Sequence, residues 1–282
     1  MITAAAAVRA AARRLEAAGT PAEQAMVDAG VLLRGLLGWS LADWLLHQER
    51  PLDQAQFDQF DRLVARRTTG EPVAYLLGER EFYGRTFRVS DAVLIPRPET
   101  ELLVDRAMAW LRDRGPAQVV DVGTGSGCIA VTLALECPQI EMQATDVSAA
   151  ALALAQENAT RLGARVRWHH TNLLDQVEAP LDLIVSNPPY VPEGDRAELM
   201  RDVRDFEPAA ALFGGGDGLD VIRQLIPLAW ARLVPGGGLM MEVGAGQRAA
   251  VTSLLAESSF RDVTWWPDLQ GIDRVVTCTR AL

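Results

Sequence analysis

The stretch that decides the fold of this chain reads Val119-Val120-Asp121-Val122-Gly123-Thr124-Gly125-Ser126-Gly127-Cys128-Ile129-Ala130. A short β-branched run ends in three alternating glycines and leads into an apolar segment that is compatible with a helix. Glycine lets a backbone approach a ligand closely, and the N-terminus of the following helix presents N–H groups that have no partner within the helix. The stretch therefore predicts a strand, a nucleotide-binding loop and a helix, in that order.

The spacing of the glycines bears on the kind of nucleotide. The dinucleotide fingerprint Gly-x-Gly-x-x-Gly would require a glycine where this sequence has Cys128. A second run, 140–145, ends at Asp146, where an acid after the second strand can accept hydrogen bonds from ribose hydroxyls. An acid that is simply solvated at a strand end is the alternative. The pattern predicts a nucleotide cradle and weakens the case for a nicotinamide dehydrogenase.

Helix and strand signals alternate at the spacing of α/β proteins after residue 95. The expected helices are 99–113, 127–136, 148–162, 219–232 and 247–257. The expected strands are 117–122, 140–145, 164–168, 181–186, 238–243, 261–266 and 273–279. The alternation predicts a doubly wound, seven-stranded mixed sheet, which binds its ligand outside the carboxyl ends of the strands.

The region before residue 95 has a different character. Residues 2 to about 70 carry apolar side chains at helical spacing, and Thr20-Pro21-Ala22-Glu23 predicts a capping box with proline at the first helical position. Gly84-Arg85 lies between two short strand-like runs and predicts a hairpin. We therefore expect an N-terminal helical bundle at 1–75, a β-hairpin linker at 76–95 and a catalytic domain at 96–282.

The tetrapeptide Asn187-Pro188-Pro189-Tyr190 follows the expected strand 181–186 and indicates the chemistry. A planar amide or exocyclic nitrogen attacks a methyl sulfonium poorly unless acceptors hold its N–H bonds and favour positive charge there. Asn187 offers a side-chain carbonyl, the two prolines leave carbonyls in a stiff segment without N–H groups, and Tyr190 adds a flat face. A proline-stiffened turn after a strand is the alternative. The motif favours methylation of a planar nitrogen.

Five segments together resemble the HemK/PrmC family of protein-(glutamine-N5) methyltransferases, over nearly the whole chain. They are Ile95-Pro96-Arg97-Pro98-Glu99-Thr100-Glu101, the 121–127 loop, Asp146, 187–190 and Phe213-Gly214-Gly215-Gly216-Asp217-Gly218. The resemblance implies a class I methyltransferase fold and S-adenosylmethionine as the cofactor. It implies as acceptor the glutamine of the Gly-Gly-Gln motif in class 1 peptide chain release factors, and thus a role in translation termination. The Asn-Pro-Pro-Tyr element also occurs in nucleic-acid amine methyltransferases, so it indicates the chemistry and not the substrate.

The resemblance also assigns roles to residues. Catalysis and acceptor binding fall to Asn187, Pro188, Pro189 and Tyr190, with Arg97 as a further acceptor contact. The cofactor contacts it implies are Gly123, Thr124, Gly125, Ser126 and Gly127 for the methionine part, Asp146 for the ribose, Asn172 and Leu173 for the adenine, and Asn187. Related enzymes often have Asp and an aromatic residue at the two adenine positions, so this chain lacks that carboxylate and stacking face.

Two further segments keep two interpretations each. Arg97, Glu99 and Glu101 are expected to order a lid over the site, or the two glutamates simply favour the start of a helix. Glycines 214–216 lack the Lys-Ser/Thr of a phosphate loop and are expected either to form a wall of the acceptor pocket or to be an ordinary loop.

Charge and composition limit the partners. The net charge is −10, and all 27 basic residues are arginines. Residues 95–282 hold 16 arginines against 25 acids, whereas nucleic-acid binders usually have a basic excess. We expect a protein partner with a basic surface, no direct nucleic-acid contact, no metal and no membrane segment, in a cytoplasmic monomer. A nucleic-acid amine methyltransferase and an inactive donor-binding scaffold are the competing hypotheses.

Overall fold

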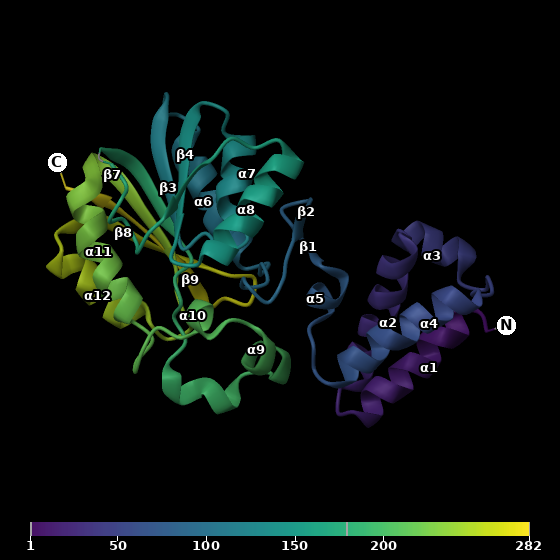
Figure 1. Cartoon of the computed structure of the whole chain (residues 1–282). Helices are drawn as coiled ribbons and strands as arrows, with labels where there is room; N and C mark the ends of the chain where they lie inside the picture. The colour runs from purple at the N-terminus through teal and green to yellow at the C-terminus, as the bar shows by residue number, and fades with distance from the viewer. Residues whose placement is uncertain (1, 179, 282) are drawn as a thin grey trace. The chain divides into compact units, whose positions relative to one another are not determined.

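The computed structural model describes residues 2–178 and 180–281 and divides into two compact units (Figure 1). One unit comprises Met1–Glu79 together with Met200–Phe206, and the other comprises Arg80–Leu199 with Glu207–Leu282. The short segment 200–206 thus belongs to the helical unit although it lies within the sequence of the larger one. Each unit has its own apolar core.

Six helices build the described part of the smaller unit. They are α1 (Ala4–Ala17), α2 (Ala22–Leu37), α3 (Leu41–His47), α4 (Gln54–Thr68), α5 (Val73–Leu77) and α9 (Arg201–Phe206). Alanines on α1 and α2 allow these helices to pack closely around Leu15, Leu32 and Leu33, which are fully buried. The capping box expected at Thr20-Pro21-Ala22-Glu23 is wrong, because Pro21 itself is the N-cap and has no side-chain donor or acceptor for it. A capping box is found at Asp53 and Gln56, at the start of α4.

Within the described ranges, no single helix is long and apolar enough to cross a bilayer, and the bent pair α2 and α3 meets that criterion only when the two are taken together.

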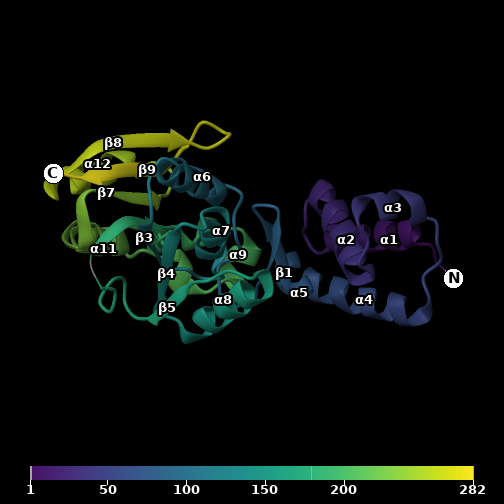
Figure 2. The same ribbon diagram turned by 90° about the horizontal axis from the view of Figure 1, so that it is seen from above.

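The larger unit contains a hairpin and a seven-stranded sheet. The hairpin pairs β1 (Glu79–Phe82) with β2 (Arg85–Arg88). The sheet strands are β3 (Ala117–Val122), β4 (Ile140–Asp146), β5 (Arg167–His170), β6 (Leu181–Ser186), β7 (Leu233–Glu242), β8 (Phe260–Pro267) and β9 (Asp273–Arg280). Their order is β5-β4-β3-β6-β7-β9-β8, and Figure 2 labels all of these strands except β6. Strand β9 runs antiparallel to both of its neighbours, and the other pairings are parallel.

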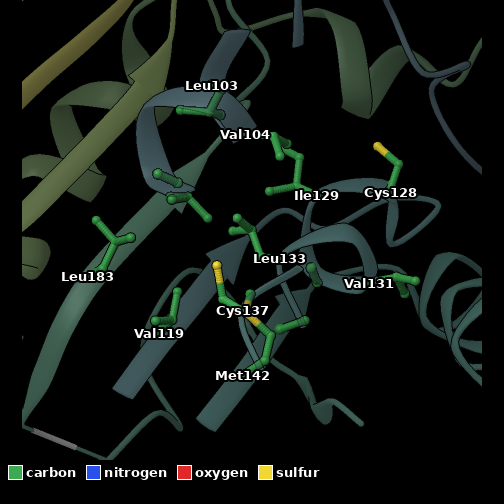
Figure 3. Close-up of a cluster of buried hydrophobic side chains, with 14 of the residues drawn as sticks. Leu103, Val104, Val119, Cys128, Ile129, Val131, Leu133, Cys137, Met142 and Leu183 are labelled. Carbon is green, nitrogen blue, oxygen red and sulfur yellow. The ribbon is translucent and has the colours of Figure 1, made fainter. Parts of the chain in front are cut away.

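Helices cover both faces of this sheet. The remaining helices are α6 (Thr100–Leu111), α7 (Cys128–Glu136), α8 (Ala149–Leu162), α10 (Ala209–Leu212), α11 (Asp220–Arg232), α12 (Arg248–Glu257) and the 3₁₀ helix η1 (Glu193–Glu198). Figure 1 shows α6, α7 and α8 on one face and α11 with α12 on the other. Neighbouring residues of a strand point to opposite faces of the sheet. Leu183 therefore joins the first core, beneath α6 and α7, and Ile184 joins the second core, beneath α11 and α12. Figure 3 shows part of the first core, in which Leu133 lies between Ile129 and Cys137.

The expected doubly wound, seven-stranded mixed sheet is confirmed. Strands β3 and β6 have the predicted bounds, while β7 begins five residues before the predicted 238. The hairpin turn is at Tyr83 and Gly84, with φ of 52° and 68°. Three short helices, η1, α9 and α10, were not predicted, because helices of four to six residues show too little periodicity.

Candidate active site

A cavity of about 370 Å³ opens at the carboxyl ends of β3, β4 and β6. The strand register explains its place, since Val122 is paired with Thr145 on one side and with Ser186 on the other. The three strands therefore end level with one another, at the switch point of the sheet where ligands bind. Among the predicted site residues, the cavity wall includes Arg97, Gly123, Gly125, Asp146, Asn172, Leu173, Asn187, Pro188 and Pro189. Thr124, Ser126, Gly127 and Tyr190 are not part of that wall.

The glycine loop is shaped by its backbone. Gly123, Gly125 and Gly127 have φ of 73°, 55° and 80°, which L-residues with a side chain rarely adopt. The N–H groups of Gly123 and Thr124 both donate to the Thr145 carbonyl oxygen at 2.9 Å. A Cβ at Gly127 would lie 3.0 Å from the Ala155 Cβ, so this third glycine allows close packing on α8. The loop is thus fixed by β4 and α8 before any ligand binds.

Two buried side chains support this loop from behind. Asn158 is fully buried and donates from Nδ2 to the carbonyl oxygens of Ser126, at 2.9 Å, and of Arg88, at 3.0 Å. Asp121 accepts a hydrogen bond from Thr124 Oγ1 at 2.6 Å. Burial raises the pKa of Asp121 to about 7, and the Thr124 hydroxyl partly opposes this shift. The Ala130 N–H also lowers the Asp121 pKa, although in the described residues the second Asp121 oxygen, Oδ1, makes no hydrogen bond of normal geometry.

The predicted ribose and adenine residues all lie at the cavity. Asp146 accepts from the N–H groups of Gly125, at 2.9 Å, and Ser148, at 2.8 Å, so its carboxylate is held between the glycine loop and the start of α8. Asn172 is exposed. Leu173 has φ of 43°, a strained value for a non-glycine residue, and is nearly buried. The position predicted for the aromatic contact is therefore occupied by an apolar side chain.

The Asn-Pro-Pro-Tyr segment lies on the opposite side of the cavity. Asn187 Nδ2 donates to Thr100 Oγ1 at 3.1 Å, and Thr100 Oγ1 donates to Glu242 Oε2 at 2.7 Å. The Tyr190 hydroxyl donates to the other Glu242 oxygen at 3.2 Å. The flat face expected of Tyr190 is not part of the cavity wall, because its hydroxyl is turned to this buried carboxylate.

Gly214 and Gly218 support the motif from behind, and residues 214–218 do not line the cavity. A Cβ at Gly214 would lie 2.5 Å from the Pro189 carbonyl oxygen, and one at Gly218 would overlap the Tyr190 carbonyl oxygen. Gln247 Nε2 also donates to the Tyr190 carbonyl at 2.9 Å. The glycines are needed here because two backbone segments lie in direct contact.

The Ile95–Glu101 segment has two separate attachments. Arg97 lines the cavity and forms an ion pair with Glu207 at 2.5 Å, and the Ile95 N–H donates to the same carboxylate at 3.2 Å. The Glu207 side chain is only 1% exposed. Glu101 accepts from the Tyr83 N–H at 2.8 Å, and Glu99 precedes α6 without a side-chain cap. Glu101 therefore anchors the hairpin, while Glu207 fixes the position of Arg97 at the cavity wall.

Sequence reasoning missed Thr100, Glu207 and Glu242 as site residues. Glu242 did carry a signal, since it is an acid within the apolar run Leu239–Val243. A buried acid in such a position needs partners, and its partners lie far away in the sequence. Thr100 gave no signal apart from its place at the start of a helix.

Known proteins resemble this chain in sequence and in fold. Residues 6–78 match the PrmC N-terminal domain, and residues 99–210 match the methyltransferase small domain. The release factor glutamine methyltransferase of Bordetella pertussis is 47% identical over 251 residues, covering 88% of this chain and 93% of that protein. That of Koribacter versatilis is 44% identical over 267 residues, 94% of each chain.

Solved structures share the fold at lower identity. A methyltransferase from Pyrococcus furiosus has a TM-score of 0.55 and 16% identity, covering 71% of this chain and 91% of its own. A 16S rRNA methyltransferase of T. Thermophilus, in complex with AdoMet and guanosine, has a TM-score of 0.52 and 21% identity, covering 72% of this chain and 49% of its own. The resemblance expected from the motifs is confirmed by the sequence relatives. This chain belongs to the release factor glutamine methyltransferase family.

Proposed function

We propose that this protein transfers a methyl group from S-adenosylmethionine to the side-chain amide nitrogen, N5, of the glutamine in the Gly-Gly-Gln motif of class 1 peptide chain release factors. The activity would modulate translation termination in the cytoplasm. The observation that carries the proposal is the shared cavity, in which the glycine loop and Asp146 face the same space as Asn187. Family membership supports the choice of a release factor as substrate.

The side of the cavity formed by the glycine loop and Asp146, here called the cradle side, fits the proposed cofactor. A Cβ at Gly123 or Gly125 would meet nothing within 4 Å, so open space adjoins the loop backbone. Asp146 is fixed by two backbone N–H groups, lines the cavity and can accept from ribose hydroxyls. Leu173 and Asn172 would contact the adenine. When bound, S-adenosylmethionine supplies an electrophilic methyl group on a sulfonium centre.

The side of the cavity formed by Asn187, Pro188 and Pro189, here called the motif side, fits a carboxamide. Asn187 Oδ1 and the Pro188 carbonyl oxygen would accept the two amide hydrogens, which aims the nitrogen at the methyl group and favours the positive charge that develops on it. Within the described ranges, neither oxygen accepts a hydrogen bond from the protein. Pro189 lines the same wall and, with Pro188, keeps the segment stiff. No protein base is needed, because the alkylated nitrogen becomes acidic and loses its proton readily.

Three regions of the chain would have separate roles. We propose that residues 1–75 recognise the release factor, that 76–95 link the two parts and that 96–282 carry out methyl transfer by a monomer. An acidic protein, with a net charge of −10, would attract a partner with the basic surface that RNA binding requires. Arg97 would contact the acceptor loop at the cavity wall.

Methyl transfer can be tested directly. Labelled S-adenosylmethionine is offered to the enzyme with a release factor, with its Gln→Ala variant in the Gly-Gly-Gln motif, and with DNA or RNA. We expect label only in the unaltered release factor, and a mass gain of one methyl group on the Gly-Gly-Gln peptide. Label in nucleic acid but not in protein would contradict the proposal and favour a nucleic-acid amine methyltransferase.

A further inference from the structure

A buried chain of side chains lies behind Asn187. It runs from Asn187 Nδ2 through Thr100 Oγ1 to Glu242 Oε2, with distances of 3.1 Å and 2.7 Å. Thr100 is 2% exposed and Glu242 is 1% exposed. Thr100 begins α6 and Glu242 ends β7, so the chain connects a helix, a strand and the Asn-Pro-Pro-Tyr segment.

Hydrogen-bond capacity fixes the direction of this chain. A carboxylate only accepts, and a threonine hydroxyl has a single hydrogen, which Thr100 donates to Glu242. Thr100 can then only accept from Asn187, so the amide must present its NH₂ group to Thr100. The Asn187 carbonyl oxygen is therefore on the other branch of the amide. Without the carboxylate, the hydroxyl could rotate and the amide could turn over.

The direction depends on Glu242 being ionised. Burial raises the pKa of Glu242, and nearby Glu99 adds to that shift. The hydroxyls of Thr100 and Tyr190 and the charge of Arg274 lower the Glu242 pKa and so favour the carboxylate. Burial raises the pKa of Tyr190, so its hydroxyl remains a donor, and burial raises the pKa of the nearby Cys128 thiol to about 12. Within the described residues, the Thr100 and Tyr190 hydroxyls both donate to Glu242, while the charges of Glu99 and Arg274 act on it in opposite directions.

We propose that Thr100 and Glu242 are positioning residues for methyl transfer, which hold the Asn187 amide with its carbonyl oxygen toward the acceptor nitrogen. The inference rests on the proposed function, because it assigns Asn187 the acceptor role. The hydrogen-bond chain would also favour methyl transfer in a second way. A hydrogen-bond chain that ends on a carboxylate polarises its members, so the Asn187 carbonyl becomes a stronger acceptor for an N–H that gains positive charge.

Kinetics of three variants test the inference. Thr100→Val keeps the shape and removes the hydroxyl, and we expect kcat to fall roughly 10- to 100-fold with little change in cofactor affinity. Thr100→Ser restores the hydroxyl and should recover kcat to within a few-fold. Glu242→Gln keeps one acceptor and adds a donor, so it should lie between the two. Thr132→Val is the matched control, because Thr132 is equally buried and its hydroxyl has no partner in the described structure.

A spectroscopic measurement tests the same geometry without turnover. In ¹⁵N-labelled enzyme, the side-chain amide resonance of Asn187 is identified by its loss in Asn187→Ala. We expect slow solvent exchange of the bonded Nδ2 hydrogen in the wild type and fast exchange in Thr100→Val. We also expect this resonance to shift as Glu242 titrates, and the shift to disappear in Glu242→Gln.

The outcomes separate the two proposals. A wild type that methylates no release factor contradicts the proposed function, whatever the resonance does. A wild type that is active while Thr100→Val keeps kcat within twofold contradicts the positioning role alone. Equal losses in Thr100→Val and Thr100→Ser, with an unchanged Asn187 resonance, would show that Thr100 contributes only to packing and would also overturn the inference.

Discussion

The two sides of the cavity are built in different ways. The cradle side is shaped by backbone conformation, with three glycines at positive φ and N–H groups bonded to β4 and to Asp146. The motif side is held by buried carboxylates, Glu242 behind Asn187 and Glu207 behind Arg97. The cradle is fixed by the neighbouring strand and helix of the same half of the sheet, whereas the orientation of the Asn187 amide depends on Glu242, which lies 55 positions away. Variants that affect one side alone can test this difference.

The largest effect is expected on the cradle side, in the pH dependence of stability. The folded-state pKa of Asp121 is raised from 3.8 to about 7, so between these values the unfolded chain loses the proton first. The free energy of unfolding should therefore fall as pH rises from 4 to 7, by up to about 4 kcal/mol from this group, and change little above pH 7. Asp121→Asn keeps an acceptor for Thr124 and should remove this contribution.

Chemical denaturation at pH 5 and pH 8 without cofactor measures the effect. The exposed Asp113→Asn serves as the control for loss of one charge. If Asp121→Asn and the wild type lose the same free energy of unfolding between the two pH values, Asp121 is ionised in the folded protein and its burial is compensated by another group.

The next effect is expected on the motif side alone. Asn187→Ala removes the proposed acceptor, and turnover should fall about 10²–10³-fold. Cofactor affinity, measured by calorimetry, should change little, because the glycine loop and Asp146 are untouched. Asn172→Ala, on the cradle side, should show the opposite pattern, with weaker cofactor binding and a smaller change in kcat. Turnover of Asn187→Ala within a few-fold of the wild type would show that the two sides are not divided in this way.

A glycine substitution tests whether the motif side also depends on backbone contact. Gly218 has φ of 77°, and a Cβ there would overlap the Tyr190 carbonyl oxygen. Gly218→Ala should destabilise the fold by roughly 1–3 kcal/mol and reduce turnover by shifting the motif. Gly216→Ala is the matched control, because a Cβ at Gly216 meets nothing within 4 Å. Thermal unfolding compares the two, and an equal Tm for both variants would contradict the contact.

The same difference explains what the sequence could predict. The glycine loop and Asn187 follow strands whose predicted bounds are exact, and Asp146 ends a strand predicted to within one residue, so their convergence followed from strand order. The partners of the motif could not be found in this way, because Thr100 and Glu242 are 142 positions apart and each resembles an ordinary helix start or strand end. Tyr190 shows the limit most clearly, since its residue type predicted a flat face but its contact is made by the hydroxyl.

The smallest effect is expected at Glu207, a buried carboxylate whose ion-pair partner, Arg97, is partly exposed. Glu207→Gln keeps the size and an acceptor for the Ile95 N–H, but removes the charge that pairs with Arg97, whose side chain is 31% exposed. Hydrogen bonds to charged groups contribute about 1.5 kcal/mol at the lower end, which corresponds to roughly a tenfold increase in the KM for the release factor. Cofactor affinity should stay unchanged, and the exposed Glu198→Gln should have no effect. A weaker cofactor affinity in Glu207→Gln would instead connect Arg97 to the cradle, because a wall that served only the acceptor would leave the cofactor site as it is.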